Sequence, residues 1–198
     1  MKNIIIGMAL IATTAASCNN GSDNTSAKIL NKDSTNQSNN SSVATSNNTN
    51  TNVAGSMQEM VSQYLQMKNA LANDNGKDAA SAGNAFVESM GKMEKTSLTP
   101  EKKKIWNDLS DDAKEMAEHI GKNAGDIEHQ REHFDMLSKD MYDMVKAFGS
   151  GQTLYNDYCP MYNNKKGATW LSDTKEIKNP YLGKKMLTCG EVKEEIKP

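Results

Sequence analysis

The stretch 99-TPEKKKIWNDLSDDAKEMAEHIGKNAGDIEHQREHFDMLSKDMYDMVKAF-148 is the clearest indication of how this chain folds. Apolar residues recur at helical spacing on both sides of a break at 121–125, which predicts two amphipathic helices. Thr99 can cap the first helix, with Pro100 at its first position, and the second helix begins at Asp126. The two apolar stripes are Ile105, Trp106, Leu109, Ala113, Met116 and Ile120, then Ile127, Phe134, Leu137, Met141, Val145 and Phe148.

Two segments upstream of this stretch have the same periodicity. Residues 57–71 carry one apolar stripe, in which Lys68 is the single polar member, and residues 77–93 carry the other. Turn residues at 73–76 separate them. Four amphipathic helices with short connections predict an all-α fold, an up-and-down four-helix bundle over residues 57–150.

The C-terminal segment, residues 151–196, has a different composition. Tyr, Trp, Gly, Pro and Asn are concentrated there. The segment is too short and irregular to fold alone. We therefore expect an irregular Cys-, Met- and Tyr-rich segment that packs on one face or end of the bundle, with room for a short hairpin, and completes the same domain.

The N-terminal residues 1–17 predict a secretory signal peptide. Lys2 supplies the positive charge, an apolar region follows, and small residues lead directly into Cys18. A cysteine at that point resembles a bacterial lipobox, which implies lipid attachment at Cys18 and a stable membrane anchor. We expect a lipoprotein of the bacterial cell envelope that faces the periplasm, anchored in the outer membrane. The alternative is an ordinary cleaved signal that leaves Cys18 free.

Residues 18–56 predict a disordered tether between the lipid and the bundle. Most of them are Asn, Ser or Thr, and few are apolar, so the segment cannot bury a core. Such a tether holds the folded part away from the membrane.

Composition and motifs argue against two classes of function. The formal net charge of -2 means that the chain has no excess of positive charge with which to bind nucleic acid. The sequence has no Gly-x-Ser-x-Gly, no glycine-rich phosphate loop and no His-Glu-x-x-His. We therefore expect neither nucleic-acid binding nor catalysis.

The other two cysteines each have a methionine close by. Cys159 precedes Met161 by two positions, and Met186 precedes Cys189 by three. In an extended chain, the side chains of residues two positions apart point to the same side. A turn brings residues three positions apart close to each other. Thiolates and thioethers are soft ligands that select Cu(I) over hard cations. The four residues therefore predict a Cu(I) site.

The same two cysteines are equally consistent with a structural disulfide. Export places them in an oxidising compartment, where a disulfide persists. A Cys159–Cys189 bond would stabilise the fold by about 3 kcal/mol. A reducible pair can also switch between the disulfide and the metal-binding state.

Two histidines add nitrogen ligands to this prediction. His129 and His133 are four residues apart on the helix expected at 126–148, so their side chains lie on the same side of it and can bind the same metal ion. Both lie on the flank of the apolar stripe, as His119 does on the preceding helix. We rank His133 after the cysteines and methionines as a ligand, and His129 last. The alternative is that these histidines lie beside the apolar stripe and bind no metal.

Several motifs resemble a bacterial family of domains of unknown function. They are HQREHF at 129–134, with LS at 137–138 and Met141, CPM at 159–161, GATWL at 167–171 and NPYLGKKMLTCG at 179–190. The resemblance covers residues 57–193. Members of this family are small exported lipoproteins, and others are appended to periplasmic adaptor subunits of copper and silver efflux pumps. The resemblance implies a periplasmic metal-handling role, with copper as the metal.

These observations predict a membrane-tethered lipoprotein that binds a soft metal, namely copper, for sequestration or hand-over to a heavy-metal efflux adaptor. The alternative is a non-catalytic interaction module of the envelope. In that case the Cys159–Cys189 disulfide is structural, and the Tyr- and Trp-rich segment docks a partner.

Overall fold

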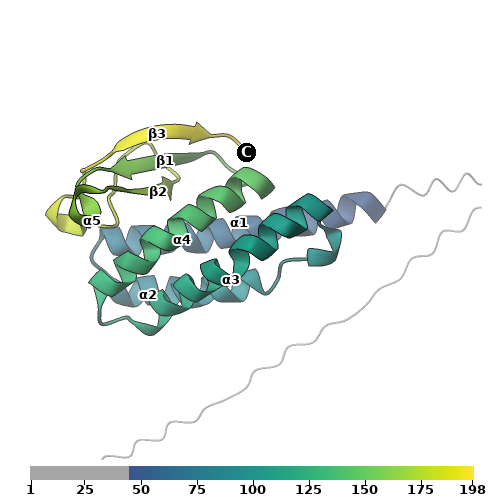
Figure 1. Ribbon diagram of the computed structural model, residues 1–198, viewed down its shortest axis with the longest axis horizontal. Coiled ribbons are helices and arrows are strands. Elements are labelled where there is room, and N and C mark those ends of the chain that lie inside the picture. Colours follow the sequence, from purple (N-terminus) through teal and green to yellow (C-terminus); the bar gives the residue numbers. More distant parts are fainter. Residues whose placement is uncertain (1–44) are drawn as a thin grey trace, which may run out of the picture. The chain divides into compact units, whose positions relative to one another are not determined.

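The computed structural model describes residues 45–198, which belong to one compact unit, Ser41–Pro198. Four long helices are followed by three strands (Figure 1). The helices are α1 (Thr45–Ala72), α2 (Gly76–Met90), α3 (Pro100–Lys122) and α4 (Ile127–Phe148). The strands are β1 (Leu154–Cys159), β2 (Ala168–Ser172) and β3 (Glu191–Ile196). The short elements η1 (Lys95–Ser97), α5 (Tyr162–Lys165) and η2 (Gly183–Lys185) lie in the connections.

The predicted signal peptide, residues 1–17, and the predicted lipid-attachment residue Cys18 lie outside the described residues. Residues 45–56 of the predicted tether lie within the described part of the chain. They belong to α1, which begins at Thr45 rather than near residue 57. The helix extends upstream because Val53 joins the hydrophobic core and Ser56 donates a hydrogen bond to the Lys92 carbonyl, at 3.0 Å. Within residues 45–198, no helix has both the length and the apolar character that a membrane span requires.

The four predicted helices are confirmed, and two of their predicted starts have the expected caps. The Thr99 hydroxyl accepts a hydrogen bond from the Lys102 backbone N–H at 3.3 Å, with Pro100 in the first turn. The Asp126 carboxylate accepts one from the His129 backbone N–H at 3.1 Å. Side-chain oxygens at these positions satisfy N–H groups that have no partner within the helix. The α3–α4 pair that carries the histidines is therefore built as the sequence predicts.

The prediction of an all-α fold is wrong, because the C-terminal segment forms a three-stranded antiparallel sheet in the order β2-β1-β3. The β1 strand has six residues and β2 has five, too few for a clear period-two pattern in the sequence. Their Tyr, Trp and Thr residues favour strands, but only pairing with distant partners buries them. The fold is a helical bundle with a small sheet, a mixed α and β architecture.

The sheet lies against α4 and α1, while α2 and α3 form the other side of the bundle (Figure 1). Buried hydroxyl groups join the two layers. Tyr64 on α1 shares a hydrogen bond of 2.7 Å with Ser138 on α4, and its oxygen accepts the Leu171 N–H of β2 at 3.0 Å. The Tyr181 hydroxyl donates to the Thr169 carbonyl of β2 at 2.5 Å. Helices and sheet therefore share one core.

Arg131 on α4 fastens the loop that precedes β3 to the bundle. Its side chain is almost fully buried and donates to the Pro180 carbonyl at 2.8 Å and to the Leu71 carbonyl at 3.0 Å. It also pairs with Asp74 at 2.6 Å and with Glu128 at 3.0 Å. Buried guanidinium groups require such complete pairing. The loop is therefore held in a defined position against α1 and α4.

Lys68, the polar member of the first predicted stripe, is 1% exposed beneath the sheet. Its ammonium group lies 3.4 Å from Ser172 Oγ and 3.5 Å from Asp173 Oδ1. Burial lowers the pKa of Lys68. Asp157 on β1 is fully buried nearby, and neither of its carboxylate oxygens has a hydrogen-bond partner within residues 45–198. Burial raises the pKa of Asp157 to about 7, against the attraction of Lys68.

Candidate metal sites

The structure brings the two predicted cysteine ligands together. Cys159, the last residue of β1, is fully buried, and Cys189 lies half-buried just before β3. Their sulfur atoms are separate thiols 3.2 Å apart. The hydrogen bond to Cys159, together with burial, raises the pKa of Cys189 to about 11. The pair can form a disulfide or share one soft ion after a small movement.

Asn179 holds the backbone of Cys189 in place. Its side-chain amide donates to the Cys189 carbonyl at 2.6 Å, and its side-chain oxygen accepts the Tyr181 and Leu182 N–H groups at 2.8 and 2.9 Å. Its own backbone N–H donates to the Leu187 carbonyl at 2.8 Å. One fully buried amide therefore closes the loop that positions the second thiol.

The two predicted methionine ligands lie on the surface. Met161 is 47% exposed and Met186 is 45% exposed. The Cys189 N–H donates to the Met186 carbonyl at 3.0 Å, so a turn does connect this pair, as its spacing suggests. Met161 and Met186 therefore lie close to the cysteines along the chain but have solvent-facing side chains.

The two predicted histidine ligands lie with a third histidine, between α3 and α4. His119 is near the end of α3, and His129 and His133 occupy the first two turns of α4. One ligand atom from each of the three lies within 4.8 Å of those of the others. The His119 and His133 rings stack with centroids 4.2 Å apart, and the His129 ring meets the His133 ring edge-on at 4.4 Å. We call these three residues the histidine site.

The ring nitrogens of the histidine site face defined neighbours. His133 Nε2 lies 3.1 Å from His129 Nε2, and His133 Nδ1 lies 3.2 Å from Met116 Sδ. His129 Nδ1 is 3.9 Å from the Glu132 carboxylate. In metal-binding histidines the outer N–H usually donates to an acceptor, which fixes the ring and leaves the inner nitrogen free to bind. The His133–Met116 contact is of this kind, whereas the distance from His129 to Glu132 is too long for a hydrogen bond. The inner nitrogens here are the two Nε2 atoms.

The electrostatic surroundings of His133 favour its neutral form over its charged form. Burial lowers its pKa below the usual range, and positive charge on His119 or His129 lowers it further. Glu132 and Glu115 act in the opposite direction as weaker influences. A neutral imidazole is the form that binds a metal ion.

The spacing of the two Nε2 atoms suits one shared ion. Two imidazole nitrogens that bind the same ion at about 2.0–2.1 Å with tetrahedral angles lie about 3.3 Å apart. The observed 3.1 Å is close to that value. His119 and His129 are 43% and 34% exposed, so an ion can reach the histidine site from solvent.

The single mixed site expected from the sequence is divided into two groups in the structure. Within residues 45–198, the group of possible ligands around His129 and His133 contains His119 and no cysteine. His119 was missing from the predicted ligands, as was the contact of Met116 with His133. The signal was present in the sequence, because the short 121–125 break places the end of α3 beside the start of α4, and all three histidines lie on stripe edges.

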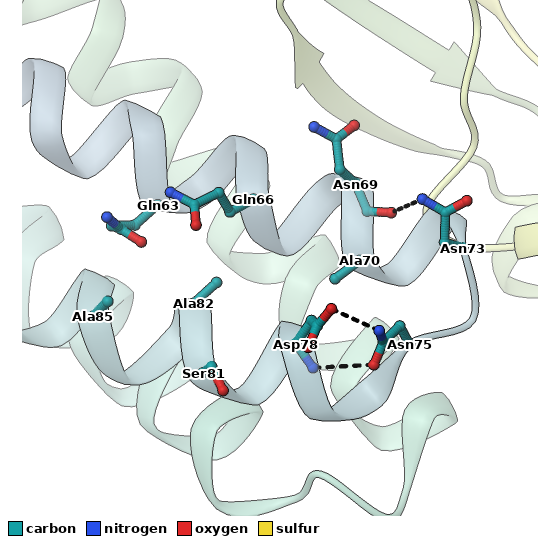
Figure 2. Close-up of a pocket in the computed structure, with 10 residues that line it drawn as sticks. All are labelled: Gln63, Gln66, Asn69, Ala70, Asn73, Asn75, Asp78, Ser81, Ala82 and Ala85. Carbon is teal, nitrogen blue, oxygen red and sulfur yellow. Dashed lines mark hydrogen bonds between the residues drawn. The ribbon is translucent and has the colours of Figure 1, made fainter.

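A cavity of about 590 Å³ between α1 and α2 contains none of these ligands. Figure 2 shows that amide side chains and small residues line it, and that its hydrogen bonds are local ones. Asn75 and Asp78 pair at the α2 cap at 2.7 and 3.1 Å, and the Asn73 side chain bonds to the Asn69 carbonyl at 2.9 Å. The cavity offers hydrogen bonds but no strong metal ligand set.

The aromatic residues of the C-terminal segment have a structural role. Trp170 and Tyr181 are 1% exposed and pack edge-to-face with centroids 5.8 Å apart. Tyr162 stacks on Tyr181 at 4.5 Å. These rings attach the sheet and its loops to the bundle, so Trp170 and Tyr181 are not surface anchors for a partner.

The helical part of the chain has a counterpart among known families. Residues 60–153 match the family described as "Protein of unknown function (DUF3347)". No curated protein and no solved structure matches the chain. The matched region contains all three histidines and Met116, and it ends before β1. The bundle that carries the histidine site is therefore similar to a domain of unknown function.

Proposed function

We propose that this protein binds copper at the histidine site, with His119, His129 and His133 as ligands. The observation that carries the proposal is the 3.1 Å approach of His129 Nε2 to His133 Nε2, with His119 beside them. Three imidazoles on two packed helices form a site that needs little rearrangement to accept an ion.

Ligand chemistry supports copper over other ions. Imidazole binds copper, zinc and nickel, and the order of affinities among divalent ions places copper first. The Met116 thioether contacts Nδ1 of His133, on the side of the ring away from the two Nε2 atoms, so it positions the ring and is not a ligand of the ion. Partial exposure of His119 and His129 allows the ion to exchange, as sequestration and hand-over require.

The N-terminal sequence supports a location at the bacterial membrane. The signal-like residues 1–17 and the lipobox-like Cys18 favour a periplasm-facing lipoprotein. The resemblance to domains appended to efflux adaptors favours such an adaptor as the partner that receives the copper. The protein then acts as a tethered copper carrier or buffer, without catalysis.

Competition titration of the purified protein with Cu(I), under anaerobic conditions, tests the proposal. Cys18, Cys159 and Cys189 are replaced by serine in every sample, so that histidines are the strong ligands left. We expect one bound ion per chain, and a loss of affinity of more than about 100-fold in His129→Ala and in His133→Ala, because losing a direct ligand costs more than losing an outer partner.

A matched control and two contrary outcomes complete the design. Met136→Ala changes an exposed residue three positions from His133 on the same helix, and it should leave the affinity unchanged. No bound copper, or equal binding by His129→Ala, His133→Ala and the parent protein, contradicts the proposal.

A further inference from the structure

A second group of metal ligands lies outside the histidine site. Cys159 and Cys189 approach to 3.2 Å at the end of the sheet where β1 finishes and β3 begins. No group of three or more His, Cys, Asp and Glu ligand atoms within residues 45–198 includes either cysteine. The thiol pair is therefore a separate, two-donor arrangement.

We propose that Cys159 and Cys189 form a second metal site, which binds one soft monovalent ion, Cu(I) or Ag(I), between two thiolates. The histidine site and this thiol site are independent of each other in ligands and in position along the chain. The inference goes beyond the proposed function, since it adds a site with a different ligand class and a preference for monovalent ions.

The backbone at the thiol site is fixed, while one side chain can adjust. Cys159 is held in β1, where it pairs with Ala168 of β2. The Cys189 backbone is held by Asn179 and by the turn to Met186. With the Zn–S distance of about 2.3 Å as a scale, two sulfurs on opposite sides of one ion lie about 4.6 Å apart, so a linear arrangement opens the pair from 3.2 Å by about 1.4 Å. Rotation of the half-buried Cys189 side chain provides that movement.

The number and type of donors select the ion. Zn(II) in a structural site requires four donors, and the thiol pair supplies two. Thiolates are soft ligands, which favour Cu(I) and Ag(I) and disfavour Mg²⁺ and Ca²⁺.

Binding at this site involves no oxidation or reduction of the ion. One monovalent ion replaces the two S–H protons, two metal–sulfur bonds form, and two protons are released to solvent. A disulfide between the same sulfurs removes both thiolates. The oxidised protein therefore keeps the histidine site and lacks the thiol site.

Native mass spectrometry of reduced protein with Ag(I) tests this inference, in chains where Cys18 is replaced by serine and both His129 and His133 by alanine, so that the thiol site is the proposed site left intact. Reduced protein should retain Ag(I) at the thiol site, and Cys189→Ser should weaken that binding by more than about 100-fold. Cys189 is half-buried, so its replacement is expected to preserve the fold, which the circular dichroism spectrum checks.

Two results overturn the inference. One is the absence of tight Ag(I) binding by reduced protein. The other is equal tight binding by Cys189→Ser and by the parent. Failure of the histidine variants to lose Cu(I) in the titration described above would instead contradict the proposed function alone, so the two proposals fail separately.

Discussion

His129 Nε2 and His133 Nε2 face each other across 3.1 Å, while the opposite nitrogen of each ring faces an acceptor, Glu132 or Met116. A proton joins the two Nε2 atoms when one ring is the Nε2–H tautomer and donates to the other. A metal ion bound by both nitrogens takes the place of that proton. Copper binding at the histidine site therefore competes with one N–H···N hydrogen bond.

Met116→Leu tests whether Met116 positions His133. Leucine keeps most of the volume but cannot accept the Nδ1–H bond, so the ring loses its preferred tautomer and orientation. We expect copper affinity at the histidine site to fall about tenfold, at the lower end of the range for outer-shell partners, because a thioether is a weak acceptor. Competition titration measures the change.

The matched control for this variant is Met136→Leu, which alters an exposed methionine on α4. Copper affinity should be unaffected in this control. If Met116→Leu binds copper as tightly as the parent protein, Met116 has no positioning role and acts only as a packing residue.

Asn179→Ala tests the closure of the loop before β3. The substitution removes three side-chain hydrogen bonds and leaves the Cys189 carbonyl without its side-chain donor. We expect a loss of about 2–4 kcal/mol in the free energy of unfolding, since buried groups without partners are costly. Urea denaturation followed by circular dichroism measures this loss.

Asn107→Ala is the control, because Asn107 is exposed on α3. Its effect on unfolding should be within about 0.5 kcal/mol. Equal stabilities of the Asn179 and Asn107 variants would show that the loop does not depend on the buried amide.

Asp157→Asn tests the buried carboxylate beneath the sheet. The pKa of Asp157 is raised from its usual 3.8 to about 7, so the folded state holds a proton that the unfolded state releases. The contribution of Asp157 to the free energy of unfolding is therefore fully present below about pH 4 and is lost as the pH rises to about 7. Between pH 4 and pH 8 the wild type should lose up to about 4 kcal/mol more than the variant.

Unfolding free energies at several pH values, measured by urea denaturation, give the comparison. Asp108→Asn serves as control, because Asp108 is exposed on α3 and its replacement should leave the wild-type pH profile in place. A profile for Asp157→Asn that parallels the wild type would mean that Asp157 is ionised in the folded protein throughout this range.

The helices were predictable because each carries its own information. The stripes, the Thr99 and Asp126 caps and the breaks at 73–76 and 121–125 all lie within a few residues of what they determine. The sheet was missed for the opposite reason. Tyr155 pairs with Ser172 on one side and with Glu195 on the other, so the strand depends on partners that local periodicity does not reveal.

The candidate ligands show the same distinction. His129 and His133 could be predicted to lie together because about one helical turn separates them. The Cys–Met pairs could be predicted because their members are only two or three positions apart. The partnership of His119 with His133 depends on how α3 packs on α4. The division into a histidine site and a thiol site likewise depends on tertiary packing, since α4 and the β1–β3 end of the sheet are separate elements.

The sharpest test is an anomalous-scattering crystal structure of the protein in which Cys18, Cys159 and Cys189 are replaced by serine, loaded with one equivalent of copper. We expect a copper peak between His129 Nε2 and His133 Nε2, about 2.0–2.1 Å from each, with the His119 ring turned toward it. Diffraction data from His133→Ala crystals treated in the same way should lack this peak. Copper absent from the three histidines in the loaded parent protein would contradict the account.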